Sequence, residues 1–363
     1  MKCGIVGLPN VGKSTLFNCL SNAKAQSANF PFCTIEPNIG MVSVPDTRLD
    51  VLEKLVKPQR VQPATVEIVD IAGLVKGASK GEGLGNQFLG NIRECNAIIH
   101  VLRCFEDGNI THVDGTIDPL RDKETIDVEL QLKDLETLEK RYEKQQKAAK
   151  SGNKTEQEKA DVLKKILKHV EQGANARAYE RSELEAEVIR DLQLLTDKPV
   201  LYLCNVDEAS AQKGNSWVEK VQKQARQEGA EVIYLAAATE ADIAELEDFE
   251  ERQMFLEDAG LKEPGVNKVI RAAYSLLNLQ TYFTAGEKEV RAWTIQKGFT
   301  APQSAGVIHT DFEKGFIRAE VIKYDDYQHY GSEQAVKEAG KMAVEGKEYI
   351  VQDGDVIHFR FNV

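Results

Sequence analysis

The fold is decided near the amino terminus by the residues Gly7-Leu8-Pro9-Asn10-Val11-Gly12-Lys13-Ser14. They match the phosphate-loop pattern, in which a glycine precedes a Gly-Lys-Ser triplet at a fixed spacing. An apolar stretch, Cys3 to Val6, precedes the loop, and a stretch of helical character, Thr15 to Leu20, follows it. Because a phosphate loop joins a strand to a helix, this context distinguishes the match from a chance glycine turn.

The loop residues predict a nucleotide-binding site. Glycines let the backbone curl so that its N–H groups point at phosphate oxygens, and the amino terminus of the following helix adds partial positive charge. We expect Lys13 to bridge the β- and γ-phosphates and to act in catalysis, and the Ser14 hydroxyl to ligate Mg²⁺. The residues assigned to nucleotide binding are Asn10, Val11, Gly12, Lys13, Ser14 and Thr15.

A second motif, Asp70-Ile71-Ala72-Gly73, ends an apolar run that starts at Val66. Ligands of open α/β sheets bind at the carboxyl ends of the strands, so Asp70 is predicted to hold the Mg²⁺ shell and the Gly73 N–H to contact the γ-phosphate. Thr34 stands where a first switch loop would supply another hydroxyl to Mg²⁺. A glycine-rich run is costly in a static connector, so a second switch segment is predicted at Gly77, Gly81, Gly83 and Gly85.

Length and composition exclude several classes of protein. The chain has 363 residues, enough for two or three domains, and is 42% hydrophobic and 29% charged, as is typical of globular proteins. Its net charge of −12 argues against a protein that coats nucleic acid, although a local basic patch is compatible with it. The six cysteines have no metal-ligand spacing and predict buried thiols. We see no signal peptide or membrane span and expect a cytoplasmic protein.

The pattern of apolar runs predicts three parts. Strand-length runs alternate with amphipathic stretches, which is typical of a parallel sheet with crossover helices; the runs are Cys3 to Val6, Val66 to Asp70, Ala97 to Leu102, Val200 to Cys204 and Val232 to Leu235. Helical spacing of Val128, Leu135 and Tyr142, and then of Val162, Ile166 and Val170, predicts a charged hairpin that either meets a partner or is simply solvated. A small α+β module closes the chain, with an Asp353-Gly354 turn before the last strand.

The expected fold class is therefore α/β, with a phosphate-loop nucleotide-binding domain built from residues 1–116 and 196–280. Residues 117–195 are predicted to form an inserted helical arm, and residues 281–363 the closing module.

The base-reading segment departs from that of GTPases. Asn205-Val206-Asp207-Glu208 stands where GTPases carry Asn-Lys-x-Asp, so Val206 replaces the lysine and Glu208 the aspartate. Losing a charge-assisted hydrogen bond costs ~1.5–3 kcal/mol, which predicts a weakened preference for guanine. It does not prove a preference for adenine, because the longer Glu208 side chain could still reach a base. Ala236 to Thr239 stands where GTPases carry the Ser-Ala-Lys signature. The backbone amides of this segment are candidates for contacting the base, and the alternative is a segment with no role in binding.

The catalytic group is also altered. Ras-type hydrolysis uses a Gln after Asp-x-x-Gly to orient water, and Leu74 stands there. Either hydrolysis is slow or another group orients the water. His112 is a candidate for that group, and the alternative is that it is an exposed loop histidine with no catalytic role. Asn10 could help to coordinate K⁺ beside the phosphates, which makes K⁺ a candidate activator.

Several stretches together resemble the YchF, or Obg-like ATPase, family of TRAFAC-class proteins: Gly7 to Thr15, Asn29 to Asn38, Asp70 to Ala78 and Asn205 to Glu208. Thr281 to Gly286 and Ile308 to Phe316 resemble the TGS module of threonyl-tRNA synthetases. The resemblance covers essentially the whole chain. It implies a G-protein-like phosphate-loop domain, an inserted helical arm and a carboxyl-terminal β-grasp TGS domain.

The resemblance also implies a function. The protein is expected to hydrolyse ATP, to prefer ATP over GTP, to use Mg²⁺ as cofactor and to associate with the ribosome. Phe105 is expected to pack on the adenine, and Asn205 and Val206 to line the adenine pocket. The resemblance favours His112 as catalytic. Contact with RNA through the arm or the TGS module, at residues such as His309 and Arg318, stays open against ordinary surface roles. We expect a monomer with no membrane contact. The rival hypotheses are a GTP-specific ribosome-assembly factor and a nucleotide-gated scaffold with negligible hydrolysis.

Overall fold

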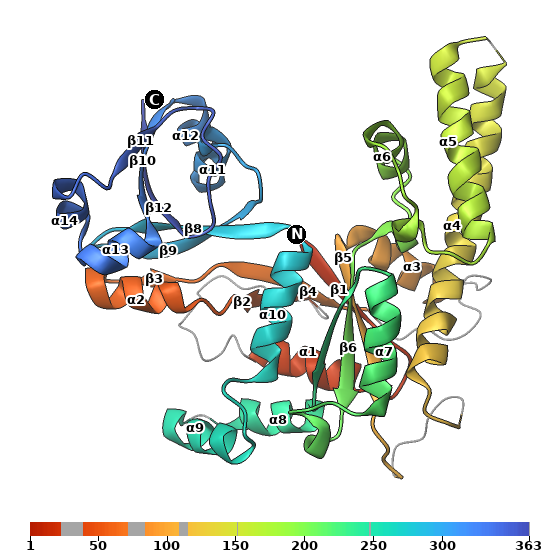
Figure 1. Ribbon diagram of the computed structural model, residues 1–363, viewed down its shortest axis with the longest axis horizontal. Coiled ribbons are helices and arrows are strands. Elements are labelled where there is room, and N and C mark those ends of the chain that lie inside the picture. Colours follow the sequence, from red (N-terminus) through yellow and green to blue (C-terminus); the bar gives the residue numbers. More distant parts are fainter. Residues whose placement is uncertain (23–38, 72–83, 109–114, 151, 247, 363) are drawn as a thin grey trace. The chain divides into compact units, whose positions relative to one another are not determined.

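The computed structural model describes residues 1–22, 39–71, 84–108, 115–150, 152–246 and 248–362 (Figure 1). The chain divides into two compact units. The first contains Met1–Met41 and Glu67–Val269, and the second contains Val42–Val66 and Ile270–Val363. None of the helices in these described ranges is both long enough and apolar enough to cross a membrane.

The first unit is built on a six-stranded sheet with the strand order β2-β4-β1-β5-β6-β7. Strand β1 pairs in parallel with β4 on one side and β5 on the other, and β5–β6 and β6–β7 are also parallel. The order reverses at β1, so the switch point where open α/β sheets bind ligands lies at its carboxyl end. The strands are β1 (Lys2–Val6), β2 (Ile39–Ser43), β4 (Thr65–Asp70), β5 (Ala97–Cys104), β6 (Val200–Val206) and β7 (Glu231–Leu235).

All five apolar runs predicted as strands are strands. Every residue of β5 and of β6 is buried, which explains why these runs show little polar alternation. Five cysteines of the described residues are buried free thiols, as predicted, and Cys33 lies outside those residues. The helices of this unit outside the arm are α1 (Lys13–Asn22), α3 (Leu84–Glu94), α7 (Ser216–Gln227), α8 (Ala237–Glu245), α9 (Phe249–Asp258) and α10 (Gly265–Leu276).

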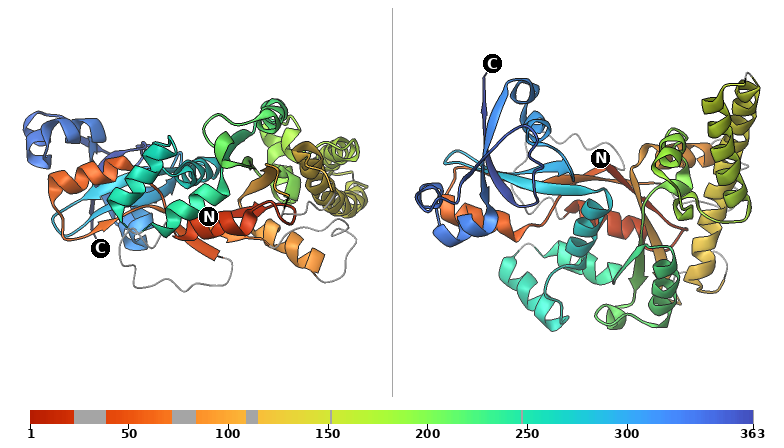
Figure 2. Two further views of the ribbon diagram at one scale, coloured as in Figure 1. Left: turned by 90° about the horizontal axis from the view of Figure 1, so that it is seen from below. Right: turned by 45° about the horizontal axis from the view of Figure 1, so that its top comes forward.

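Between β5 and β6 the chain forms the predicted helical hairpin of α4 (Pro119–Ala149) and α5 (Lys154–Glu171), the paired yellow helices of Figures 1 and 2. The Asp118 carboxylate accepts hydrogen bonds from the first-turn N–H groups of α4, and Pro119 occupies a position where no N–H is needed. Asn153 caps α5 in the same way. A shorter helix, α6 (Glu183–Arg190), follows with a Ser182–Glu185 capping box.

The hydrophobic core of the arm differs from the predicted seam at one position. Val128 is 49% exposed, whereas Leu138, ten residues later, is completely buried. The buried residues of α4 include Ile126, Leu130 and Leu138, which recur at intervals of four and eight residues. Val128 is two residues from both Ile126 and Leu130, or about 200° round the helix, and so lies on the opposite side. The core of the arm comprises Leu138, Leu163, Ile166, Val170, Ala176, Ile189, Leu192 and Leu194, with Leu135, Tyr142 and Val162 partly buried beside it.

The base of the arm is fastened to the sheet by buried polar contacts. The Asp134 carboxylate of α4 accepts hydrogen bonds from the Leu195 N–H at 2.7 Å and the Thr196 N–H at 2.8 Å, just before β6. Burial raises the pKa of Asp134, and these donors oppose the shift. Loss of this carboxylate would leave two buried N–H donors without an acceptor, which costs free energy. The contact therefore fixes the position of α4 relative to the start of β6.

An ionic cluster lies beside it. Lys123 Nζ of α4 is 2.7 Å from carboxylate oxygens of both Asp127 and Glu228, and Arg177 approaches the same carboxylates at 3.5 and 3.6 Å. Burial opposes ionisation of Asp127 and Glu228, but the two cations outweigh it and lower the pKa of both carboxyl groups. The cluster therefore holds the arm against α7 as a set of paired charges.

His100 of β5 lies next to this cluster with its ring 5.8 Å from that of Tyr202. Its Nε2 is buried and has no hydrogen-bond partner among the residues that the structure describes. Burial lowers the pKa of His100 from 6.5 to about 4, with Asp127 opposing the shift and Lys123 and Arg177 adding to it.

We predict that His100 makes the fold sensitive to mild acid. The unfolded chain takes up this proton near pH 6.5 and the folded chain only near pH 4, so stability falls as the pH decreases between these values, by about 3 kcal/mol. His100→Gln should remove this part of the pH dependence in urea unfolding measured at about pH 7 and about pH 5. The exposed His329→Gln is the control, and an identical pH dependence in His100→Gln and wild type would contradict the prediction.

The second unit has a mixed sheet with the order β11-β10-β12-β8-β9-β3. Its first and last long strands, β8 (Leu279–Ala285) and β12 (Asp355–Phe361), are parallel neighbours, and β9 (Val290–Gln296) and β10 (Phe316–Lys323) flank them antiparallel. The core gathers Tyr282, Ile357 and Phe359 against α11 (Ala301–Ile308). This is the predicted β-grasp arrangement, and the predicted Asp353-Gly354 turn precedes β12 with Gly354 at φ 87°.

Residues 42–66 belong to this second unit, a placement that no sequence pattern predicted. They supply α2 (Thr47–Val56) and β3 (Val61–Gln62), which pairs with β9. Arg48 of α2 forms ion pairs with Asp46 and Asp353, each at 2.7 Å. The division into three parts with boundaries after residues 116, 195 and 280 stays a prediction. The remaining elements are β11 (Ala343–Glu345), α12 (Thr310–Lys314), α13 (Tyr324–Tyr330) and α14 (Glu333–Glu338).

Candidate nucleotide-binding site

The loop between β1 and α1 has the curled backbone that the phosphate-loop pattern predicted. Asn10 and Gly12 have φ angles of 64° and 91°, in the left-handed region. A Cβ atom on Gly12 would also collide with the side-chain amide of Asn205. Backbone conformation and space thus both require glycine at position 12.

The first turn of α1 is prepared to bind an anion. It contains no acidic residue. The Leu16 N–H donates to the Gly12 carbonyl at 3.0 Å, so the N–H groups of Lys13, Ser14 and Thr15 before it have no partner within the helix. Such groups, with the positive end of the helix dipole, are the usual ligands of phosphate.

A pocket of about 830 Å³ opens at this loop, within the size range of ligand sites. Most of the predicted site residues that the structure describes line it together: Asn10, Gly12, Lys13, Ser14, Thr15, Phe105, Asn205 and Val206. Val11 is buried beneath the loop and does not line the pocket. The residues predicted to bind the phosphates and those predicted to bind the base therefore line one cavity.

Asn205 holds the two ends of this pocket together. Its Nδ2 donates to the Val11 carbonyl at 3.0 Å, and its Oδ1 accepts from the Ala237 N–H at 2.9 Å. Ala237 is the first residue of α8 and lines the pocket with Ala238. The Asn205 side chain thus acts as a clamp between the phosphate loop and the Ala236 to Thr239 segment.

The residues predicted to hold Mg²⁺ include one member of an ion pair. Lys13 Nζ contacts Asp70 Oδ1 at the carboxyl end of β4. Asp70 and the exposed Ser14 hydroxyl offer hard oxygen donors, which suit Mg²⁺. Within the described ranges no three His, Cys, Asp or Glu residues gather as a metal site, so a magnesium ion here would need other oxygen ligands, such as phosphates.

Four predicted site features lie outside the described residues. They are Thr34, Gly73, His112 and most of the glycine-rich second switch, namely Leu74, Gly77, Gly81 and Gly83, whereas its last glycine, Gly85, is the second residue of α3. Their assignments stay predictions.

The side chain that supports Phe105 is Arg103, which the sequence motifs did not indicate. Arg103 is almost completely buried, and its guanidinium lies 4.6 Å from the centre of the Phe105 ring. Its Nε donates to the Phe105 carbonyl at 3.2 Å and its Nη2 to the Asp107 carbonyl at 3.4 Å. A lone arginine at the end of the apolar strand Ala97–Cys104 was the available signal, since buried arginines require several partners.

The other base-side residues have distinct roles. Asp207 is exposed and accepts a hydrogen bond from the Ser210 N–H at 2.9 Å, so its role is local capping. Glu208 is exposed at the pocket lining. Glu240 of α8, which is buried, accepts from the Gly265 and Val266 N–H groups at 2.7 and 3.1 Å and anchors α8 against the first turn of α10.

Comparison with known proteins identifies the family. A family described as "50S ribosome-binding GTPase" matches residues 2–134, and the carboxyl-terminal YchF-GTPase family, described as a protein of unknown function, matches residues 279–362. The "Ribosome-binding ATPase YchF" of Haemophilus ducreyi is 59% identical over 362 residues, covering 100% of this chain and 99% of that protein. This chain belongs to the YchF family.

Other YchF proteins agree over the full length. The "Ribosome-binding ATPase YchF" of Bacillus subtilis is 55% identical over 365 residues, covering 100% of both chains. The solved structure of the Schizosaccharomyces pombe YchF GTPase superposes with a TM-score of 0.90 at 40% identity, covering 99% of this chain and 97% of that one. The resemblance drawn from the motifs, and the fold class it implied, are thereby confirmed.

We predict that Arg103 controls recognition of the base in this YchF chain. Arg103→Met should lower ATP affinity about tenfold, because Phe105 and the Asp107 carbonyl lose their support, while affinity for inorganic pyrophosphate stays unchanged. Isothermal titration measures both, and Arg226→Met on the outer helix α7 is the control. An equal loss for ATP and pyrophosphate would mean that Arg103 only stabilises the fold.

Proposed function

We propose that the chain is an ATP-binding and ATP-hydrolysing switch protein that prefers ATP over GTP and associates with the ribosome. The observation that supports this most is a phosphate loop that shares one pocket with Phe105, Asn205 and Val206. Names among the relatives support ribosome association but differ on the nucleotide, since some are called ATPases and the solved structure a GTPase.

The residues at the base end favour ATP. Val206 is buried at the pocket and provides an apolar contact where GTPases have a lysine. A guanine would therefore lose a charge-assisted contact that an adenine does not need, while either base can stack against the Phe105 ring. The clamp formed by Asn205 is independent of the base, because both of its hydrogen bonds go to backbone atoms of the protein.

At the phosphate end, Lys13 and the first-turn N–H groups of α1 bind the β- and γ-phosphates. Ser14 and Asp70, joined by Thr34 as the sequence predicts, would hold Mg²⁺, which neutralises phosphate charge during transfer. Arriving phosphates compete with Asp70 for Lys13, so nucleotide binding would break their ion pair. The freed Asp70 carboxylate is then available to the Mg²⁺ shell.

Hydrolysis is expected to be slow unaided, because Leu74 cannot orient water by hydrogen bonding. His112 is proposed as the group that does so, and Asn10 as a K⁺ ligand beside the phosphates. We further propose a cytoplasmic, monomeric protein whose arm or carboxyl-terminal unit contacts the ribosome or its RNA.

The nucleotide preference is tested by isothermal titration of the full-length protein with ATP and GTP in the presence of Mg²⁺. The loss of one or two charge-assisted contacts predicts that GTP binds about tenfold to a hundredfold more weakly than ATP. Val206→Lys should reduce the difference between the ATP and GTP affinities. The control is Leu184→Lys, which introduces a lysine at an exposed position in the arm. Tighter binding of GTP would favour the rival GTPase hypothesis.

Catalysis is tested by phosphate release with and without ribosomes. His112→Ala should lower the rate by about a hundredfold at unchanged ATP affinity, as expected for removal of a group that acts on water. His169→Ala in the arm is the control. If His112→Ala released phosphate at the wild-type rate, His112 would be excluded as a catalytic residue. If the wild type released almost no phosphate even with ribosomes present, the nucleotide-gated scaffold would be favoured.

A further inference from the structure

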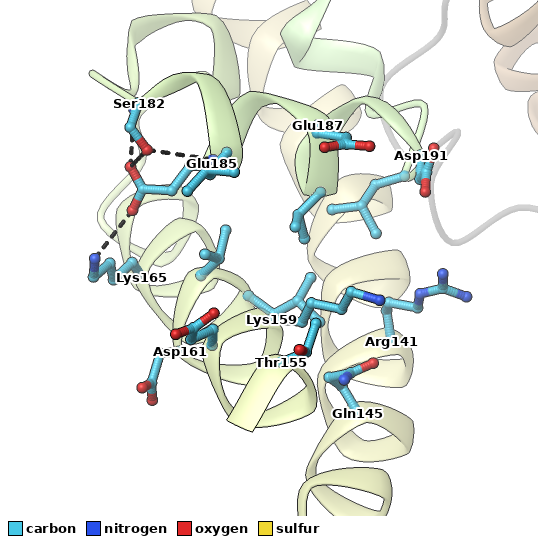
Figure 3. Close-up of a pocket in the computed structure, with 16 residues that line it drawn as sticks. Arg141, Gln145, Thr155, Lys159, Asp161, Lys165, Ser182, Glu185, Glu187 and Asp191 are labelled. Atoms are coloured by element: carbon cyan, nitrogen blue, oxygen red, sulfur yellow. Dashed lines mark hydrogen bonds and ion pairs between the residues drawn. The ribbon is translucent and has the colours of Figure 1, made fainter. Parts of the chain in front are cut away.

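A groove in the arm has no part in nucleotide binding. It lies between α6 and the α4–α5 hairpin and has a volume of about 670 Å³ (Figure 3). Arg141 and Gln145 come from α4, Thr155 and Lys159 from α5, and Glu187 from α6. All three helices belong to the first unit, so the groove is a feature of that unit alone.

The interior of the groove is apolar. Val162 and Val188 are only partly buried against the arm core, and Leu163 closes the base of the groove. Leu184, at the start of α6, is 78% exposed at its rim. A large aliphatic side chain at the edge of a partly filled apolar groove favours binding of another apolar side chain there.

The charges around the groove are not balanced. Lys165 is paired with Glu185 at 3.0 Å and Lys159 with Glu156 at 3.5 Å, so both cations are compensated within the arm. The side-chain carboxylates of Asp161, Glu187 and Asp191 form no hydrogen bond or ion pair with any residue that the structure describes.

Figure 3 shows how these acidic groups lie. Glu187 and Asp191 stand on the α6 side, one helical turn apart, and Asp161 lies on the α5 side. The negative charges outnumber the positive ones: the groove is lined by five carboxylates, those of Glu158, Asp161, Glu185, Glu187 and Asp191, and by three cations, those of Arg141, Lys159 and Lys165. The groove therefore combines an apolar floor with a negative rim.

We propose that this groove binds a basic protein segment that carries an aliphatic anchor between lysine or arginine residues. The anchor would pack on Val162, Val188 and Leu184, and its flanking cations would pair with Glu187, Asp191 and Asp161. A nucleic acid backbone is excluded as the occupant, because its phosphates would meet the same carboxylates. The inference rests on the proposed ribosome association and makes its partner at this site a protein rather than RNA.

The test uses full-length protein and three fluorescent probes. They are a short amphipathic peptide of lysine and leucine at helical spacing, the same peptide with glutamate in place of lysine, and a short single-stranded RNA. We expect only the lysine peptide to bind. Glu187→Lys should weaken it about tenfold, since one attractive pair becomes a repulsive one. Glu183→Lys makes the same charge change on the exposed side of α6, outside the groove lining, and should leave the affinity within about twofold.

The proposal would be overturned if the lysine peptide bound wild type and Glu187→Lys with equal affinity. It would also be overturned if the wild type bound the RNA and Glu187→Lys changed the affinity for RNA. Self-association abolished by Glu187→Lys would assign the groove to a second copy of the chain and would also overturn it. Circular dichroism and ATP titration of each variant confirm an intact fold. Co-sedimentation of the wild type with ribosomes tests the proposed function separately, because the peptide result stands whether or not the protein sediments.

Discussion

The two hydrogen bonds of the Asn205 side chain are the constraint on which the nucleotide site depends. They join the Val11 carbonyl, in the loop after β1, to the Ala237 N–H, in the segment after β7, through a residue of β6. Loops from separate strands thereby become one pocket. The clamp also explains Gly12, since any larger residue there would displace the Asn205 amide.

Support for this site extends outward through buried polar side chains. Arg103 holds the segment that carries Phe105, and Glu240 fixes α8 against α10. Asp134 and the cluster around Lys123 fasten the arm to the same sheet. Each of these groups is buried with partners, so each costs much to disrupt and leaves little freedom to the elements it joins.

The sequence predicted most of this unit because its signals are local. A phosphate loop, its flanking strand and helix, the apolar strands and the helical hairpin of α4 and α5 all follow from the spacing of residues. Residues 42–66 were missed because their partners are distant in sequence: Arg48, for example, pairs with Asp353. Arg103 was missed for another reason: its partners, the Phe105 and Asp107 carbonyls, are backbone atoms, and no pattern of side chains reveals that they bind it. Val128 is exposed because the buried residues of this part of α4, such as Ile126 and Leu130, lie on the opposite side of the helix, which the spacing of Val128, Leu135 and Tyr142 did not indicate.

Amide hydrogen exchange at Ala237 tests the clamp most directly. As the first residue of α8, Ala237 has no helical acceptor for its N–H, so its protection depends on the Asn205 Oδ1 atom. The account predicts a protected Ala237 amide in the nucleotide-free wild type and rapid exchange in Asn205→Ala, together with faster exchange in the phosphate loop and unchanged exchange in β5. Unchanged protection of Ala237 in Asn205→Ala would contradict it.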